Sequence, residues 1–144
     1  MRIMGLDVGE RRIGVALSDE LGLTAQPCCV VEVDRRDPTA AVERIVELCA
    51  EHEVELVVIG LPLSLSGGDL GSSSRRARSL GERICGHGRL EIVYRDERFS
   101  TREAERVLIG AGVRRADRKK SVDKMAAALI LQGYLDGEAD ANRS

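Results

Sequence analysis

The sequence has very few aromatic residues, which argues against one mode of nucleic-acid binding. Among 144 residues the only aromatic ones are Tyr94, Phe99 and Tyr134, and there is no tryptophan. Proteins that hold single strands by base stacking need exposed aromatic side chains as platforms. We therefore expect no stacking platform on this chain.

Cysteine and histidine are too few and too widely spaced to indicate a zinc site. The four cysteines, Cys28, Cys29, Cys49 and Cys85, form no Cys-x-x-Cys pair, and no His-x-x-x-His pair accompanies them. Zinc sites draw their ligands from such closely spaced pairs. We expect the cysteines to be buried free thiols in a reducing compartment.

Long hydrophobic runs and a charge excess are also missing. No run approaches the roughly 20 apolar residues of a membrane-spanning helix. The apolar N-terminal run is short and is interrupted by Asp7, so we expect no signal peptide and a cytoplasmic protein. Because the net charge is -2, a nucleic-acid site must come from local clustering of the 22 lysines and arginines.

The remaining composition is that of an ordinary globular protein. Hydrophobic residues make up 43% of the chain and charged residues 32%. A chain of 144 residues is long enough to bury a core within one domain. We expect a single domain over residues 1–137 and a frayed polar tail over 138–144.

Two short apolar runs near the N-terminus predict a β-hairpin. Ile3–Leu6 and Ile13–Leu17 flank the polar, glycine-containing stretch Val8–Arg12, a pattern typical of two strands joined by a tight turn. Asp7 breaks the apolar character of the first strand. A carboxylate there is costly to bury unless it has a partner such as a metal ion. The alternative is that Asp7 caps the turn.

Strand and helix patterns alternate through the rest of the chain and indicate an α/β fold. Pro27 near the start of the next strand predicts an edge position. The β-branched run at 56–61 predicts a strand covered on both faces and reached by a parallel crossover. The expected strands are 25–33, 56–61 and 90–94, and the expected helices are 37–52, 74–85, 100–111 and 121–135.

Two polar segments are candidates for substrate contact. The glycine-rich stretch 64–74 follows the strand at 56–61, at the end where open α/β sheets hold ligands. Arg75 and Arg76 near the start of the next helix oppose its dipole, which suggests an electrostatic role, with a solvated surface as the equal alternative. The most basic segment, 114–120, precedes the last helix, and a solvated loop is its alternative reading.

Four carboxylates lie where an ordinary hydrophobic core has none. Asp7 is in the first strand, Asp96 and Glu97 follow a later strand, and Asp123 is in the first turn of an apolar helix. If the fold brings three of them together, their oxygens suit Mg²⁺ or Mn²⁺. Asp96 and Glu97 compete for one position. For Asp123 the alternative is stabilisation of the helix N-terminus.

Four stretches, in order and over nearly the whole chain, are similar to one known family. They are G-L-D-V-G-E-R-R-I-G-V-A-L-S-D at 5–19, V-V-I-G-L-P-L at 57–63, Y-R-D-E-R-F-S-T-R-E-A-E at 94–105 and S-V-D-K-M-A-A-A-L-I-L-Q-G-Y-L at 121–135. On these stretches the chain resembles the YqgF (RuvX-like) family, described as pre-16S rRNA nucleases and as Holliday junction resolvase-like proteins.

The resemblance implies an RNase H-like fold, a mixed five-stranded sheet flanked by helices. It also implies a catalytic and metal-binding triad of Asp7, Glu97 and Asp123, with Mg²⁺ or Mn²⁺ as cofactor. The chain departs from the family in the loop at 64–72, where a more regular asparagine and glycine pattern is usual. Because this loop is expected to line the substrate groove, the departure affects what the resemblance implies about the fine shape of that groove.

The activity that the resemblance implies is that of a metal-dependent nuclease, a phosphodiester hydrolase that processes the 5′ end of pre-16S rRNA in ribosome biogenesis. Cleavage of branched DNA and a non-catalytic nucleic-acid scaffold are the alternatives, each as a monomer or a homodimer. An actin-like ATPase or sugar kinase shares the early Asp-x-Gly hairpin, but its cleft needs two such domains. Phosphate contacts are expected from Arg11, Arg12, Arg75, Arg76, Arg114, Arg115, Arg118, Lys119 and Lys120.

Overall fold

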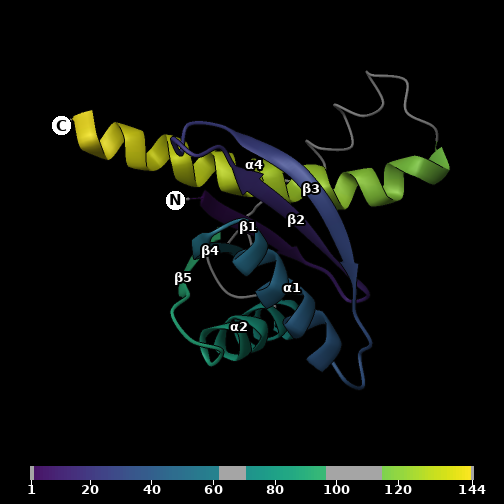
Figure 1. Cartoon of the computed structure of the whole chain (residues 1–144). Helices are drawn as coiled ribbons and strands as arrows, with labels where there is room; N and C mark the ends of the chain where they lie inside the picture. The colour runs from purple at the N-terminus through teal and green to yellow at the C-terminus, as the bar shows by residue number, and fades with distance from the viewer. Residues whose placement is uncertain (1, 62–70, 97–114, 144) are drawn as a thin grey trace.

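The computed structural model describes residues 2–61, 71–96 and 115–143, which form one sheet and the helices that cover it (Figure 1). The helix predicted at 100–111 lies outside the described residues. The strands are β1 (Arg2–Val8), β2 (Arg12–Ser18), β3 (Ala25–Glu32), β4 (Val54–Leu61) and β5 (Glu91–Asp96). The helices are α1 (Thr39–Glu51), α2 (Ser72–Cys85) and α4 (Arg115–Arg143).

The five strands are arranged in the order β3-β2-β1-β4-β5 and mix both directions. β1 and β2 pair antiparallel, as do β2 and β3, whereas β4 pairs parallel with both β1 and β5. The parallel pair β4–β5 is joined by a crossover through α2. These observations confirm the predicted mixed five-stranded sheet, the N-terminal hairpin and the edge position of the strand that contains Pro27.

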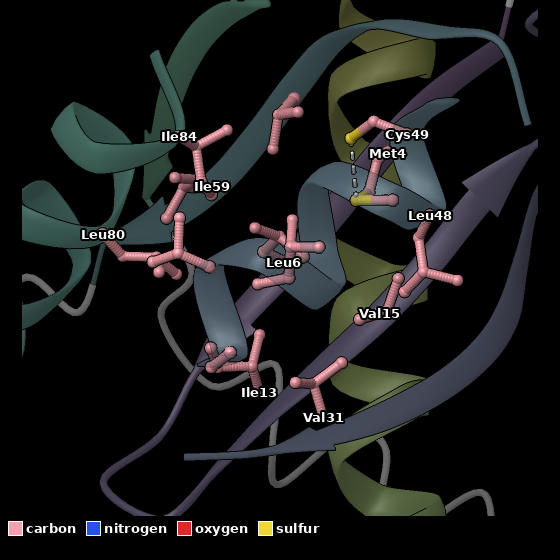
Figure 2. Close-up of a cluster of buried hydrophobic side chains, with 14 of the residues drawn as sticks. Met4, Leu6, Ile13, Val15, Val31, Leu48, Cys49, Ile59, Leu80 and Ile84 are labelled. Atoms are coloured by element: carbon pink, nitrogen blue, oxygen red, sulfur yellow. Dashed lines mark hydrogen bonds between the residues drawn. The ribbon is translucent and has the colours of Figure 1, made fainter. Parts of the chain in front are cut away.

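One face of the sheet packs against α1 and α2 (Figure 2). Side chains alternate along β1, so Met4 and Leu6 point into this cluster while Ile3 points to the opposite face. The Cys49 thiol of α1 donates to the sulfur of Met4 at 3.8 Å. Burial raises the pKa of Cys49 to about 11, so this thiol is protonated and chemically inert at neutral pH.

The prediction of four buried cysteines is right only for Cys49. Cys28 and Cys29 are half-buried because they lie on the edge strand β3, and Cys85 is exposed at the end of α2. All four are free thiols. The error arose because position on an edge strand or at a helix end overrides the general preference of cysteine for the interior.

The opposite face of the sheet packs against α4, and the contact is unusually close. A Cβ added at Gly5 of β1 would come within 2.8 Å of the Ala127 carbonyl oxygen and 2.7 Å of the Leu131 Cβ. The surrounding cluster is built from small residues such as Ala16, Ala127 and Ala128, with Val58 from β4 among the larger ones. Glycine and alanine at these positions let the helix backbone rest directly on the strands.

The bounds predicted for the last helix are wrong at both ends. We expected it to begin at Ser121 and end near Leu135, but α4 runs over 29 residues, from Arg115 to Arg143. Arginine and lysine are good helix formers, so the basic segment joins the helix. At the other end, an anchored helix extends through polar residues at low cost because its nucleus already exists.

Residues 138–143, expected as a frayed tail, therefore belong to α4. The single domain over 1–137 stays a prediction. Within the part of the chain that the structure describes, no helix is both long and apolar enough to cross a membrane.

Candidate functional site

Asp7 lies at the carboxyl end of the central strand, on the face that α4 covers. It is the second-last residue of β1 and is half-buried. Gly5 contacts α4, and residues two apart on a strand share a face, so Asp7 points to the α4 side. Its register partner on β2 is Gly14. Because β1, β4 and β5 are parallel, their carboxyl ends meet at the same edge of the sheet.

Asp123 is held beside Asp7 by the passage of α4 over Gly14. A Cβ added at Gly14 would overlap the carbonyl oxygen of Asp123. Only glycine at this position therefore allows α4 to pack so close to β2. Directly opposed residues of an antiparallel pair have Cα atoms about 4.5–5.5 Å apart. The backbone of Asp123 therefore sits above the immediate neighbour of Asp7. The backbones of these two predicted site residues therefore lie near each other, and their roles as metal ligands stay a prediction.

Arg12 is the cationic partner of Asp123. The Nε atom of Arg12 lies 3.0 Å from Oδ2 of Asp123, and the two side chains are 28% and 25% exposed. Oδ2 itself is buried, so water and salt screen this pair of charges less than they would at an exposed site. A guanidinium at this distance offsets the mutual repulsion of Asp7 and Asp123.

Asp96 lies on the wrong face of the sheet to join this pair. Arg95 rests against α4, because a Cβ at Gly133 would come within 3.0 Å of its Nε. Tyr94 points to the other face, where its hydroxyl donates to the Arg78 carbonyl oxygen at 3.3 Å. Alternation along β5 then places Asp96 on the Tyr94 side, away from Asp7. Glu97, the competing candidate, lies outside the described residues and stays a prediction.

The donors that are present fit a hard divalent cation. Among the residues that the structure describes, no three histidine, cysteine or acidic side chains are grouped to hold a metal ion. Asp7 and Asp123 contribute two carboxylates, and the third predicted ligand, Glu97, is outside those residues. An all-oxygen, doubly negative donor pair is typical of Mg²⁺ and Mn²⁺ sites and not of zinc sites.

The predicted phosphate-binding residues lie in three places. Arg11 is exposed in the β1–β2 turn, which is closed by a hydrogen bond from the Gly9 backbone nitrogen to the Arg12 carbonyl oxygen at 2.9 Å. Arg75 and Arg76 lie on α2, on the face of the sheet opposite α4. The remaining ones, Arg115, Arg118, Lys119 and Lys120, belong to the first turns of α4, and Arg114 lies outside the described residues.

The importance of Gly14 was missed from the sequence, although a signal was present. An isolated glycine inside a strand often marks the close approach of another backbone. Gly14 stands in the middle of the second strand, Arg12–Ser18. That observation alone would have predicted a helix packed directly against this point.

Replacing Arg12 with glutamine should weaken the fold and strengthen metal binding. Loss of the partner leaves Asp123 next to Asp7 without the compensating charge, and we expect the unfolding free energy to fall by about 1–3 kcal/mol, between the surface and buried limits. The same loss removes a cation that repels Mn²⁺. Calorimetric titration with Mn²⁺ and thermal melting measure the two effects.

Arg11→Gln is the matched control for this prediction, because Arg11 is adjacent, carries the same charge and is exposed. Arg11→Gln should change neither the free energy of unfolding nor the affinity for Mn²⁺ appreciably. An equal Mn²⁺ affinity in Arg12→Gln and wild type would show that Arg12 does not act on the carboxylates.

The arrangement of strands and helices defines the fold class of this protein. Solved resolvases share the fold: the RuvC of T. thermophilus in complex with a Holliday junction substrate has a TM-score of 0.61 at 16% identity, covering 96% of each chain. The fowlpox virus resolvase in complex with Holliday junction DNA has a TM-score of 0.58 at 12% identity, covering 95% of this chain and 98% of the other. The protein has the RNase H-like fold of the RuvC-type resolvases.

Within that class the family is also clear. The family model described as "RuvX: Holliday junction resolvase" matches residues 1–137, and the chain belongs to this family. A relative from Symbiobacterium thermophilum is 50% identical over 139 residues, covering 96% of this chain and 94% of its own. One from Lactococcus lactis subsp. cremoris (strain SK11) is 47% identical over 138 residues, covering 96% of both. Both carry the name "Putative pre-16S rRNA nuclease", and the resemblance inferred from sequence is confirmed.

Proposed function

We propose that this protein is a metal-dependent nuclease that processes the 5′ end of precursor 16S rRNA. The observation that carries the proposal is that the backbone of Asp123 crosses Gly14, the register partner of Asp7, at the carboxyl edge of a resolvase-like sheet. The names of the relatives from S. thermophilum and L. lactis support the choice of substrate.

The chain's own residues have distinct roles in this proposal. Asp7, Asp123 and Glu97 would hold Mg²⁺ or Mn²⁺, and the bound ion would activate water and stabilise charge on the scissile phosphate. Arg12 fixes the Asp123 carboxylate in place through its 3.0 Å contact. The close approach of α4 to Gly14 sets where the backbone of Asp123 lies relative to β1 and β2.

Branched DNA is the second candidate substrate, and the family description as a Holliday junction resolvase favours it. The chemistry at the phosphodiester would be the same. Incubation of the protein with labelled precursor rRNA and with a synthetic four-way junction, each with Mg²⁺, Mn²⁺ or EDTA, separates the candidates. Metal-dependent cleavage of the precursor supports the proposal. Binding of both substrates without cleavage of either would make the protein a scaffold.

Neutralising the basic segment should weaken nucleic-acid binding and flatten its salt dependence. The variant replaces Arg114, Arg115, Arg118, Lys119 and Lys120 with glutamine. Each lost phosphate contact should lower the slope of log K against log salt by about 0.7–0.9, because fewer counterions are released. Fluorescence anisotropy over a series of KCl concentrations measures the slope. An unchanged slope would show that the segment is only a solvated surface of α4.

A further inference from the structure

Two adjoining cavities flank the segment Val33–Arg36, which follows the edge strand β3. The first has a volume of about 490 Å³ and also contacts Arg11 and Arg12. The second, of about 430 Å³, extends from Val33–Arg36 across to Arg76 and Arg83 of α2. Both cavities are lined by the whole of Val33–Arg36, and we call the two together the arginine groove.

The arginine groove is strongly basic in a protein that is slightly acidic. Six arginines and three acidic residues line the two cavities, whereas the whole chain has a net charge of -2. Positive charge concentrated in a concave surface raises the local concentration of anions. The groove is therefore a site for a polyanion rather than for a neutral ligand.

Four of these six arginines make no ion pair among the described residues, and the exposed Arg11 of the β1–β2 turn is one of them. Arg35 pairs with Glu10 at 2.7 Å, and Arg12 pairs with Asp123. Within the described ranges, the other three without an ion pair are Arg36, Arg76 and Arg83. Like charges gathered in one groove destabilise a fold unless a ligand neutralises them. Available guanidinium groups, each able to bind a phosphate through two N–H donors, are suited to a chain of phosphates.

The groove ends at the β1–β2 turn, next to residues that adjoin the aspartates in sequence or by ion pairing. Its second cavity reaches Val8 and Gly9, the residues that directly follow Asp7 in the chain. Its first cavity reaches Arg12, the ion-pair partner of Asp123. An extended anion lying in the groove would thus reach the β1–β2 turn, at the carboxyl end of β1 where Asp7 lies.

We propose that the arginine groove binds the phosphodiester backbone of the nucleic-acid strand that is cleaved, through Arg36, Arg76 and Arg83. The strand then passes the β1–β2 turn and continues along α2, on the face of the sheet opposite α4. This inference rests on the proposed function and adds a second contact surface to it. Arg35, Arg36 and Arg83 were not among the residues expected from sequence.

The test compares two double variants that lose the same charge. Arg36→Gln with Arg83→Gln removes two exposed groove arginines. Arg44→Gln with Arg89→Gln is the control, because Arg44 is exposed on α1 and Arg89 lines a separate cavity near His87. Binding of labelled precursor rRNA and of the four-way junction is measured by anisotropy in EDTA over a range of KCl. Thermal melting verifies that both variants are folded.

The groove variant should bind at least tenfold more weakly at low salt, with a slope reduced by about 1.4–1.8 for two lost phosphate contacts. The affinity of the control variant for nucleic acid should stay within twofold of the wild-type value. If the slope of log K against log salt is equal in all three proteins and the wild type binds, the groove is not a nucleic-acid site. The proposed function would be unaffected by that result. A wild type that binds neither nucleic acid would overturn both. Competition by inorganic phosphate at low concentration would make the groove a small-anion site and also overturn the proposal.

Discussion

Asp7→Asn should abolish metal-dependent cleavage while the protein remains folded. The amide keeps the size and shape of the side chain but removes the negative charge, and an amide binds Mg²⁺ poorly. Since in the proposed site the ion would supply both the activated water and the charge stabilisation, the cleavage rate should fall by about two to four orders of magnitude. Single-turnover cleavage of precursor rRNA at saturating Mg²⁺ measures the loss.

Stability and nucleic-acid binding should both survive this substitution. Removing one of two neighbouring carboxylates relieves their repulsion, so the melting temperature in EDTA should not fall. The arginines that we propose as phosphate contacts are unchanged, so anisotropy should report the wild-type affinity. A variant that cleaves like wild type would return Asp7 to the role of a turn cap. A variant that unfolds would make Asp7 structural.

Asp96→Asn is the matched control for Asp7→Asn. Asp96 also lies at the carboxyl edge of the sheet, at the end of β5. However, the alternation of β5 places it on the face of Tyr94, opposite that of Asp7. Cleavage should therefore stay near the wild-type rate. If it falls as far as in Asp7→Asn, the choice of Glu97 over Asp96 is wrong.

The sheet could be predicted because its patterns are local. The hairpin follows from two apolar runs around a glycine turn, and the edge position of β3 from Pro27. The ends of α4 could not be predicted in the same way. The basic residues before Ser121 and the polar residues after Leu135 have no apolar periodicity, and they are helical because the buried centre of α4 nucleates the helix for them.

The candidate site was predictable in part, for a related reason. Carboxylates in a strand and at an apolar helix are conspicuous in a sequence, so Asp7 and Asp123 could be identified. The partnership of Arg12 with Asp123 depends on how α4 crosses β2, which no local pattern specifies. The arginine groove joins Val33–Arg36 to α2, and these segments are separated by a helix and a strand. Only the fold brings them together.

Gly14→Ala should damage both the fold and the site. A Cβ at position 14 would overlap the Asp123 carbonyl oxygen, and this is backbone that no rotamer change can move. Overpacking of this kind costs about 1–3 kcal/mol, and more where the obstacle is rigid. To relieve the overlap α4 must move away from β2, and Asp123 then moves away from Asp7. We expect a lower melting temperature and a cleavage rate that falls by more than the unfolded fraction explains.

Gly5→Ala separates the loss of stability from the loss of site geometry. It also forces a Cβ against α4, but at Ala127 and Leu131, further along the helix from Asp123. Its Cβ would come within 2.7 Å of the Leu131 Cβ and 2.8 Å of the Ala127 carbonyl oxygen, so it should also destabilise the protein. Asp123, however, is two helical turns from Leu131 and its position over Gly14 is not directly obstructed. Both variants are compared in cleavage and Mn²⁺ titration at a temperature well below both melting transitions. At that temperature Gly5→Ala should bind Mn²⁺ and cleave nearly as wild type does, and Gly14→Ala should not. Equal activity of the two variants would show that the contact between α4 and Gly14 does not set the geometry of the aspartates.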